Sequence, residues 1–277
     1  MNLPALINGK SADTIPITDR GLQYGDGLFE TVAVVENRLL CWDEHLTRLQ
    51  DGCRRLNIEY PGSRQLTDEA QQLATASERA VLRLTLTRGS GGRGYAPPPG
   101  AVPSRILSLH PWPDYPAANR EHGVNVRLCM NRLASNPLLA GMKHLNRLEQ
   151  VLARGEWDDP AIAEGLMLDQ AGNVIEGTMS NLFVVRQNAL MTPDVSQAGI
   201  AGIIRGRVLA LATEMDIDAM IATLDLHDIE TADELFLCNS LIGIWPVCGI
   251  GDKKFTPGPW THAIRDRLIQ YGYVSPD

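Results

Sequence analysis

Residues 141–150 of the 277-residue chain read GMKHLNRLEQ and hold one of only four lysines in the sequence. The other three are Lys10 near the start and the pair Lys253 and Lys254 near the end. An arginine serves as well as a lysine for a surface charge, but only a lysine amine can lose its proton and attack a carbonyl. Lys143 is therefore our first candidate for a lysine that forms a Schiff base. The alternative is an exposed lysine in an arginine-rich chain.

The composition of the chain narrows the class of protein. The length suffices for one large or two medium domains, and 44% hydrophobic with 21% charged residues is ordinary for a globular protein. The formal net charge of −8 argues against a general nucleic-acid binder. No apolar run approaches the roughly 20 residues that cross a bilayer, and the start MNLPALINGK lacks the features of a signal peptide. We expect a cytoplasmic protein that binds neither nucleic acid nor membrane.

The cysteines and histidines suggest neither a disulfide framework nor a metal site. The five cysteines are odd in number, widely spaced and without a CxxC pair. The six histidines are equally dispersed, and His144 beside Lys143 has no second ligand four residues on. We therefore expect no bound metal. The cysteines are Cys41, Cys53, Cys129, Cys238 and Cys248.

The first part of the chain alternates strands and helices. An Asn-Gly turn near residue 9 predicts a hairpin, and Asp43 is placed to cap a helix whose apolar residues recur at helical spacing. Arg48 lies on the flank of that apolar stripe, where periodicity alone indicates a solvated surface charge. The expected strands are 6–9, 11–17, 28–35, one that ends near Trp42, 80–87 and 104–110. One helix is expected after Asp43, with the apolar positions Leu46, Leu49, Cys53 and Leu56, and a second helix is expected over 67–77.

The loop RGSGGRG at residues 88–94 formally matches the dinucleotide pattern GxGxxG. That pattern requires a helix to begin at the loop, whereas Tyr95, Ala96 and three prolines follow here. We reject the match. A glycine-rich loop that carries Arg88 and Arg93 is either an anion clamp or lid, or simply a long hairpin end.

The second half of the chain begins after the segment 112–122, which is rich in proline, small residues and charges and is the best linker in the sequence. Within that half, Glu176 ends an apolar strand, where a carboxylate is usually paired or functional; an exposed strand-end glutamate is the alternative. The expected strands are 124–130, 165–169, 173–176 and 180–185, and the expected helices are 146–154, 203–215 and a structural one over 261–270.

Two further places can contact a ligand. Gly202 opens the helix over 203–215, and backbone N–H groups at such a helix start bind phosphate well; many glycines before helices have no such role. Asn239 and Ser240 lie between two apolar strands, where they either reach a ligand or form a plain turn.

Together these features describe a site for pyridoxal phosphate. A lysine holds the cofactor aldehyde, an acid keeps the ring nitrogen protonated so that the ring withdraws electrons, and an arginine with helix amides binds the phosphate. Lys143, Glu176, Arg48, the Gly202 helix start and Ser240 supply each of these groups.

The resemblance to a known family is then explicit. The stretches YGDGLFET, HLTRL, KHLNRLEQ, EGTMSNLF, AGIIRG and CNSLIGIWPV, in this order and spacing, resemble the fold-type IV pyridoxal phosphate enzymes along nearly the whole chain. That family includes branched-chain aminotransferases, D-amino acid aminotransferases and 4-amino-4-deoxychorismate lyases. Two stretches, TRGSGGRGY at 87–95 and LAGMKHLNRLEQVLAR at 139–154, are similar to the lyases in particular.

The resemblance implies an α/β (α+β) fold of two domains, like that of D-amino acid aminotransferase, and a homodimer with its sites at the domain cleft. We place an N-terminal α/β domain at 1–111, a linker at 112–122 and a cofactor-binding domain at 123–277. The resemblance also implies conversion of aminodeoxychorismate to 4-aminobenzoate, the folate precursor, and pyruvate. The alternatives are an aminotransferase with the same cofactor and, less favoured, a non-enzymatic cofactor carrier.

The same resemblance assigns roles to individual residues. It implies that Lys143 forms the imine with pyridoxal 5'-phosphate, that Glu176 pairs with the ring nitrogen, and that Thr31 helps in proton transfer. The implied phosphate and cofactor contacts are Arg48, the amides of Ile203 and Ile204, Ser240 and Asn239. The substrate is a dianion, and the implied contacts to it are Arg93, Arg88, Arg147, Tyr95 and Phe29. Many aminotransferases have a tyrosine where Arg147 stands, which leaves the contact to the cofactor oxygen open.

Overall fold

The computed structural model describes residues 4–276, so the first three residues of the N-terminal stretch lie outside it. The chain forms two compact units, each described here by itself. Unit 1 runs to Pro113 and also takes in Met142–Asn146, and unit 2 holds Asp114–Gly141 and the chain from Arg147 onward. The expected linker stays a prediction; in the structure its residues include the short helix α4 (Ala118–Glu121).

Unit 1 contains a six-stranded antiparallel sheet in the order β2-β1-β6-β5-β3-β4. The expected hairpin near residue 9 is confirmed, because Asn8 and Gly9 both take positive φ, 52° and 77°, as a tight hairpin turn requires. Its second strand is shorter than expected and ends at Ser11, before Pro16, which has no N–H to donate. The strands are β1 (Ala5–Ile7), β2 (Lys10–Ser11), β3 (Gly27–Val35), β4 (Arg38–Leu39), β5 (Arg79–Thr87) and β6 (Ser104–Pro111).

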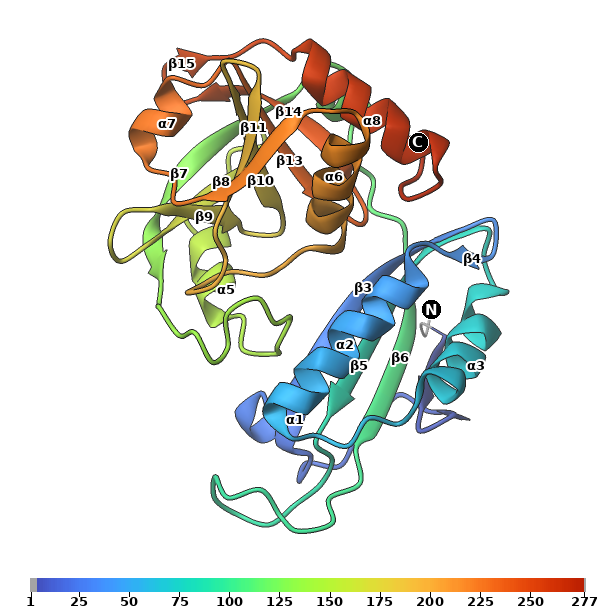
Figure 1. The fold of residues 1–277 in the computed structure, drawn as a ribbon. Helices are drawn as coiled ribbons and strands as arrows, with labels where there is room; N and C mark the ends of the chain where they lie inside the picture. Colours follow the sequence, from blue (N-terminus) through green and yellow to red (C-terminus); the bar gives the residue numbers. More distant parts are fainter. Residues whose placement is uncertain (1–3, 277) are drawn as a thin grey trace. The chain divides into compact units, whose positions relative to one another are not determined.

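Helices α2 and α3 lie in front of this sheet (Figure 1) and contact β3 and β5 respectively. The expected apolar stripe of α2 is confirmed at Leu46, Leu49 and Cys53, which are buried. The expected cap is wrong: the N-cap residue is Cys41, and Asp43 lies inside the first turn, where a carboxylate still faces the positive end of the helix dipole. Helix α3 begins four residues before the expected start. The helices are α1 (Arg20–Tyr24), α2 (Trp42–Leu56) and α3 (Ser63–Ala74).

Unit 2 contains a nine-stranded mixed sheet in the order β12-β11-β10-β13-β14-β7-β8-β9, with β15 paired to β14. Its last strand, β9, also contacts β10, so the sheet curves back on itself. The strands are β7 (Val124–Leu133), β8 (Ile162–Asp169), β9 (Val174–Gly177), β10 (Asn181–Arg186), β11 (Ala189–Pro193), β12 (Asp218–Ala222), β13 (Glu234–Asn239), β14 (Gly243–Ile250) and β15 (Lys253–Lys254).

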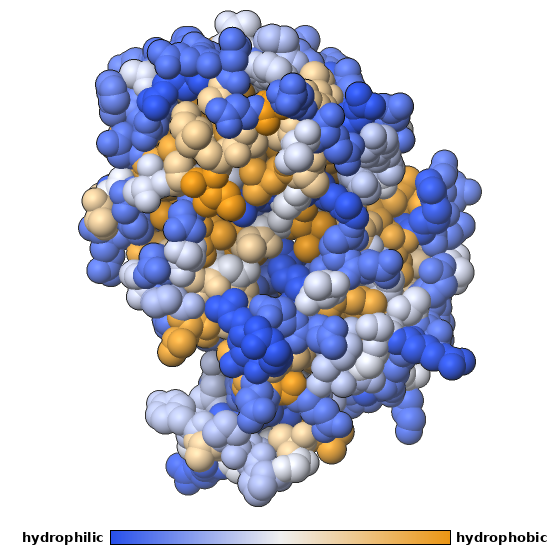
Figure 2. Space-filling view, viewed as in Figure 1, coloured by the Kyte–Doolittle hydropathy of each residue, from blue (hydrophilic) through white to orange (hydrophobic). Residues whose placement is uncertain are grey.

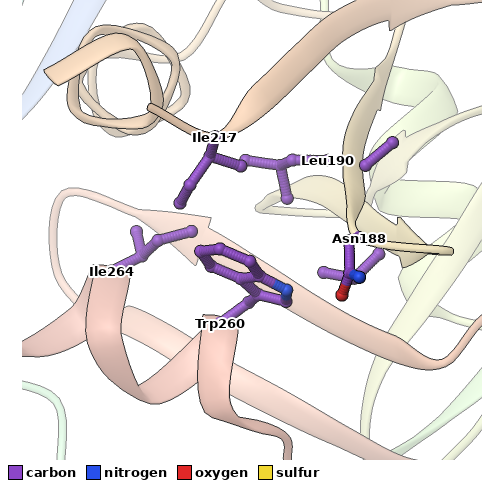
Figure 3. A pocket seen from close by; sticks show the side chains of 7 residues that line it. Asn188, Leu190, Ile217, Trp260 and Ile264 are labelled. Atoms are coloured by element: carbon purple, nitrogen blue, oxygen red, sulfur yellow. The ribbon is translucent and has the colours of Figure 1, made fainter. Parts of the chain in front are cut away.

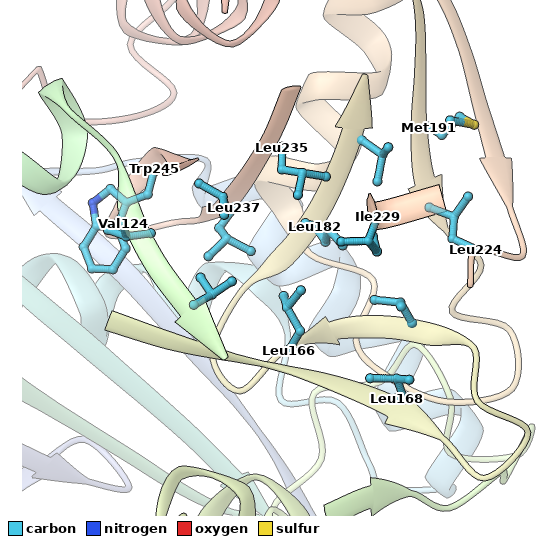
Figure 4. Packing of buried hydrophobic residues seen from close by; sticks show 14 of the residues in the cluster. Val124, Leu166, Leu168, Leu182, Met191, Leu224, Ile229, Leu235, Leu237 and Trp245 are labelled. Carbon is cyan, nitrogen blue, oxygen red and sulfur yellow. The ribbon is translucent and has the colours of Figure 1, made fainter. Parts of the chain in front are cut away.

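The core of unit 2 lies inside this curved sheet. Figure 4 shows leucines from β8, β10 and β13 that point toward one another, with Trp245 of β14 at one end of the cluster. Helices α6 and α8 contact each other and the strand β13, while α5 packs on β7 and β8. The helices are α5 (Leu148–Arg154), α6 (Ile203–Glu214), α7 (Leu226–Glu230) and α8 (Pro259–Gln270).

Two further sequence expectations, one on helix α5 and one on the loop between β5 and β6, have clear outcomes. Helix α5 begins at Leu148 rather than at residue 146, because Leu145 and Asn146 instead donate hydrogen bonds to the carbonyls of Gly27 and Gly25. Rejection of the dinucleotide motif is confirmed, since no helix follows the glycine-rich loop between β5 and β6. Within residues 4–276, no helix is both long enough and apolar enough to cross a bilayer.

Candidate active site

Lys143 sits in a segment that continues the sheet of unit 1. The short strand β4 pairs with only the end of β3, which leaves the first half of β3 open on that side. Residues 142–146 occupy this edge: the amide of Phe29 donates to the carbonyl of Lys143 at 2.9 Å, and the amide of Leu145 donates to the carbonyl of Gly27 at 3.0 Å. The backbone on both sides of Lys143 is therefore fixed, and its half-buried side chain starts from a rigid edge.

The amine of Lys143 lies against an aromatic ring. Its Nζ is 4.5 Å from the ring centroid of Phe29, and the guanidinium of Arg83 lies 4.3 Å from the same centroid. Burial lowers the pKa of Arg83 from its usual value. The Phe29 ring thus contacts two cations, of which only the lysine can serve as a nucleophile or base.

A buried group of three charged or titratable side chains, Glu30, His45 and Arg48, lies beneath this edge. Glu30 on β3 accepts from His45 Nδ1 at 2.6 Å and from Arg48 Nε and Nη2 at 2.9 and 2.5 Å. His45 and Arg48 are three residues apart on α2, so one face of the helix carries both. The side chains of Glu30 and His45 are 1% exposed and that of Arg48 is 13% exposed.

The electrostatics of this group are consistent with a fixed Arg48 cation. Burial raises the pKa of Glu30, but the Arg48 charge and the hydrogen bonds from His45 and Arg48 outweigh it and bring the pKa to about 2. Burial lowers the pKa of His45 although the bond and charge of Glu30 oppose it. At neutral pH Glu30 is therefore an anion and His45 a neutral ring, so the carboxylate orients Arg48 through two N–H groups.

The substrate residues expected from the glycine-rich loop differ sharply in exposure. Arg88 is 8% exposed and donates to both oxygens of Asp26 and to the carbonyls of Leu56 and Asn57. Four of its five N–H groups are thus bound inside unit 1, which gives this side chain a structural role. Arg93 and Tyr95 are exposed, and the half-buried Thr31 lies on β3 next to Glu30.

In unit 2, Glu176 lies on β9 and is 3% exposed. Its Oε2 accepts from the amide of Ile200 at 2.8 Å, and its Oε1 accepts from Gln150 Nε2 at 3.4 Å. The close approach requires Gly199, with φ 84°, because a Cβ there would lie 3.2 Å from the Glu176 carboxyl carbon and 2.7 Å from Ile175 Cγ2. The strand-end glutamate is therefore buried and held, not a solvated charge.

Arg147 and Gln150 bring polar groups to the same carboxylate. Burial lowers the pKa of Arg147, and the charges of Glu176 and Glu149 oppose that shift, so Arg147 and Glu176 interact electrostatically. Gln150 is 8% exposed, and its Oε1 is a buried acceptor to which no donor is bound among the described residues. A buried carboxylate beside such an oxygen is suited to receive a further N–H donor.

The start of helix α6 fits an anion. Its N-cap residue is Gly202, and within the described chain no side chain caps this helix. A Cβ at Gly202 would lie 2.0 Å from Asn181 Oδ1, so only glycine permits the turn that brings Asn181 Nδ2 to the carbonyl of Ile200 at 2.9 Å. The amides of Ile203 and Ile204 therefore stand at the positive end of the helix dipole.

Glu164 is a further buried carboxylate, next to the turn that follows Glu176, that was not among the residues expected from sequence. It is 1% exposed on β8, and its carboxylate accepts from the amides of Gly165, Thr178 and Met179 and from the hydroxyls of Thr178 and Ser180. The turn that follows Glu176 is thus tied to one buried anion. A glutamate inside the apolar strand IAEGLML was the available indication.

Asn239, the last residue of β13, and Ser240, which follows it, have different contacts. Asn239 donates from Nδ2 to the carbonyl of Met179 at 3.0 Å, and its Oδ1 accepts from the amides of Leu241 and Ile242. Its side chain therefore builds the turn and supports the segment held by Glu164. Ser240 is half-buried, and its cofactor contact stays a prediction.

A separate hollow in unit 2 is not the site. Figure 3 shows it between Trp260 and Ile264 of α8 and the residues Leu190 and Ile217. Ligand pockets typically carry several convergent polar groups. Apart from the indole of Trp260, Asn188 is the one polar side chain in this lining, so the hollow lacks such a group of polar side chains. Among residues 4–276, no group of three or more His, Cys, Asp or Glu side chains could hold a metal.

Comparison with known proteins places this geometry in a family. The sequence profile of the family described as amino-transferase class IV matches residues 27–250. The chain therefore belongs to the class IV aminotransferase family, and the expected two-domain α/β class is confirmed.

The chain is similar to an aminodeoxychorismate lyase of Vibrio harveyi, 38% identical over 266 residues, which cover 95% of this chain and 98% of the relative. The crystal structure of 4-amino-4-deoxychorismate lyase from Pseudomonas aeruginosa is 45% identical, with a TM-score of 0.93 over 96% of this chain and 98% of that one. A D-alanine aminotransferase of Bacillus licheniformis is 27% identical over 96% of both chains.

Proposed function

We propose that this chain is a pyridoxal phosphate-dependent lyase that converts 4-amino-4-deoxychorismate to 4-aminobenzoate and pyruvate. The observation that carries the proposal is the 45% identity, over nearly the full length, to a solved lyase of that activity. Identity to the D-alanine aminotransferase is much lower, at 27%. An aminotransferase with the same cofactor is the second candidate, and it rests on that relative.

Three observations support a fit between this cofactor and the residues present. The start of α6 offers amides without a side-chain cap, which suits a phosphate. Glu176 and the unbonded Gln150 Oε1 are buried acceptors, which suit a protonated ring nitrogen. Arg48 is a cation held in one orientation by Glu30.

We assign the cofactor contacts accordingly. Lys143 holds the aldehyde, Glu176 the ring nitrogen, and Arg48 and Ser240 join the amides of Ile203 and Ile204 at the phosphate. Asn239 acts by holding the turn next to Ser240 rather than by direct contact. When bound, pyridoxal phosphate supplies an aldehyde that links to the substrate amine and a ring that withdraws electrons from the neighbouring carbon.

Lys143 has two tasks in this chemistry. With the cofactor bound, the Lys143 amine would hold its aldehyde and, once free and uncharged, would take the proton from the substrate carbon that carries nitrogen. Glu176 would accept the N–H of the cofactor ring nitrogen. The electron pair left on this substrate carbon would expel the neighbouring ether oxygen. Pyruvate would depart as its enol, and the six-membered ring of the substrate would become aromatic. Thr31, next to Glu30 on β3, is our candidate for a role in proton transfer.

The dianionic substrate requires cations, and the expected arginines differ in exposure and in the groups that they contact. Arg93 is exposed in the glycine-rich loop, with the 85% exposed Tyr95 two residues on. Arg147 is half-buried and interacts with Glu176. We assign substrate carboxylates to Arg93 and Arg147, with Tyr95 and Phe29 as apolar contacts. Arg88 is left to its structural role because its donors are bound to Asp26 and to carbonyls.

The test is a comparison of two product sets. Purified protein loaded with pyridoxal phosphate is given aminodeoxychorismate, and 4-aminobenzoate and pyruvate are measured without any added keto acid. We expect both products in equal amounts. In parallel, D-alanine or a branched-chain amino acid is supplied with 2-oxoglutarate; transamination there, with no 4-aminobenzoate in the first assay, would replace the lyase by the aminotransferase.

We also propose that the protein is a cytoplasmic homodimer. The exposed apolar side chains Leu148, Val151 and Leu152 share one face of α5, at 68%, 62% and 56% exposure, and suit a self-association surface. Figure 2 shows apolar residues among hydrophilic ones on the visible face. Light scattering decides the oligomeric state: we expect twice the 30.3 kDa chain mass, and a monomer would contradict the proposal.

A further inference from the structure

The glycine-rich loop between β5 and β6 is held at its tip by a side chain outside the loop. Arg20 of α1 is 3% exposed, and its guanidinium donates from Nη1 to the carbonyl of Gly94 at 2.9 Å and from Nη2 to the carbonyl of Tyr95 at 3.0 Å. Both carbonyls directly follow Arg93 in the chain. A buried arginine that binds two successive carbonyls fixes the backbone at that point.

The aromatic residue Tyr24 completes this contact. The guanidinium of Arg20 lies 4.8 Å from the ring centroid of Tyr24, and the ring of Tyr95 meets Tyr24 edge-on at 5.5 Å. The amide of Gly94 donates to the Tyr24 hydroxyl at 3.1 Å. Arg20 and Tyr24 together therefore hold the backbone and one side chain of residues 94–95.

Asp26 connects this clamp to the base of the loop. Its Oδ2 accepts from Arg20 Nε at 2.8 Å and from Arg88 Nε at 2.7 Å. The amide of Arg88 also donates to the carbonyl of Asp26, and the amide of Arg20 donates to the carbonyl of Gly89. The Asp26 carboxylate thus binds both Arg20, which contacts the tip of the loop, and Arg88, which is the first residue of the loop.

The same turn also meets the segment of Lys143. Asn146 Nδ2 donates to the carbonyl of Gly25 at 3.1 Å, and the amide of Leu145 donates to the carbonyl of Gly27 at 3.0 Å. Asp26 lies between these two glycines. The conformation of the loop and the position of the lysine segment are therefore set by one turn of unit 1, residues 24–27.

We propose that Arg20 and Asp26 are positioning residues that hold residues 93–95 in the shape that binds the substrate carboxylate. This rests on the proposed function for the identity of the ligand, but not for the clamp itself. Neither side chain takes part in proton transfer. Their loss is therefore expected to weaken substrate binding rather than the chemical step.

The experiment uses trypsin, which cleaves after an exposed arginine such as Arg93. Arg20→Lys keeps a cation for Asp26 but cannot bind two carbonyls and the carboxylate at once. Cleavage of the Arg93–Gly94 bond in the holoenzyme is monitored by mass spectrometry. In Arg20→Lys we expect this cleavage to become about tenfold faster, which corresponds to a loss of about 1.4 kcal/mol in the free energy that holds the loop in place. For aminodeoxychorismate, KM rises about tenfold while kcat changes less than about twofold.

Arg105→Lys is the matched control, because Arg105 is a similarly buried arginine paired with Glu69 in the same unit. It should leave both the Arg93 cleavage rate and KM at the wild-type values. Tyr24→Phe is the milder variant in case Arg20→Lys folds poorly, since it removes only the hydroxyl that binds the Gly94 amide. It should move cleavage and KM in the same direction by a smaller factor.

Two results would overturn the proposal: Arg93 cleavage in Arg20→Lys and Tyr24→Phe no faster than in the control, or faster cleavage with KM unchanged. The result that would contradict the proposed function is a different one: the wild-type protein would form no 4-aminobenzoate from aminodeoxychorismate. In that case the cleavage rates still decide whether Arg20 holds the loop, and the loss of binding is measured with benzoate-type dianions as probes.

Discussion

The buried glutamate carboxylates of the two units are bound by different kinds of groups. In unit 1, Glu30 and Glu69 are paired with Arg48 and Arg105 respectively. In unit 2, Glu164 accepts from amides and hydroxyls of the turn after β9, and Glu234 accepts from the amides of Trp260 and Thr261 and the hydroxyl of Thr261.

This difference shows what each unit uses its carboxylates for. A carboxylate paired with arginine fixes the direction of a cation, as Glu30 does for Arg48. A carboxylate bound by backbone amides fixes a turn, as Glu164 does after Glu176. Glu176 itself combines both, because it accepts from the Ile200 amide and lies in the field of Arg147.

The largest effect is expected at Lys143, where the chemistry is proposed to occur. Lys143→Ala removes the proposed base and cofactor attachment, and we expect kcat/KM for aminodeoxychorismate to fall by at least about 10⁴-fold. Lys254→Ala, at an exposed lysine, is the control and should retain full activity. Substantial turnover by Lys143→Ala would show that unit 1 does not supply the reactive amine.

The next effect tests the charged pairs of unit 1. Arg105→Met leaves Glu69 buried and unpaired, and we expect the free energy of unfolding to fall by about 3–5 kcal/mol. The double variant Arg105→Met/Glu69→Leu removes both charges and should regain most of that loss. Urea denaturation of the two variants measures the difference; equal stability of the single and double variants would contradict the pairing.

Acid should destabilise the Glu30 group. The pKa of Glu30 is about 2 in the fold against an ordinary value of 4.5, so its stabilising effect is complete above about pH 4.5 and is lost as the pH falls toward 2. The difference corresponds to about 3 kcal/mol. The pKa of His45 lies below its usual 6.5. His45 therefore adds to the loss of stability below about pH 6.5, because the unfolded chain binds a proton at this histidine more readily than the folded chain does.

The measurement for this acid effect is the unfolding free energy of wild type and Glu30→Gln as a function of pH. The gap between the two proteins should shrink as the pH falls from 4.5 toward 2. Glu36→Gln, at a 77% exposed side chain, should show no such change. A constant gap for Glu30→Gln would mean that the carboxylate is not held as an anion.

The smallest effect is expected in unit 2. Glu164→Gln keeps the shape of the side chain but turns one acceptor into a donor that faces other donors, so we expect a loss of about 1–3 kcal/mol in unfolding free energy. Ser180→Ala removes only one of the bonds and should cost about 1 kcal/mol. A Glu164→Gln loss larger than that of Arg105→Met would reverse the comparison between the units.

The features that could be predicted from sequence are those with a local cause. The Asn8–Gly9 turn, the apolar stripe of α2 and the helix after Gly202 follow from spacing and backbone chemistry within a few residues. Lys143 stood out through composition, and Glu176 through its place at the end of an apolar strand. Family motifs then supplied the roles that spacing alone left open.

The features that could not be predicted depend on distant contacts. Arg48 looked like a surface charge because its partner Glu30 lies 18 residues earlier on another element. The ion pair of Arg88 could not be predicted for the same reason, since Asp26 is 62 residues away. Helix α5 starts late because residues 145–146 bond to the turn near Gly25, which no local pattern indicates.

The most direct test of the proposed role of Lys143 is to locate the cofactor on the chain. Holoenzyme is reduced with borohydride, which makes an imine link permanent, and the labelled peptide is identified by mass spectrometry. We expect the pyridoxyl mass on Lys143 and not on Lys10, Lys253 or Lys254. Label on one of those three lysines, or none on Lys143 in a protein that makes 4-aminobenzoate, would contradict it.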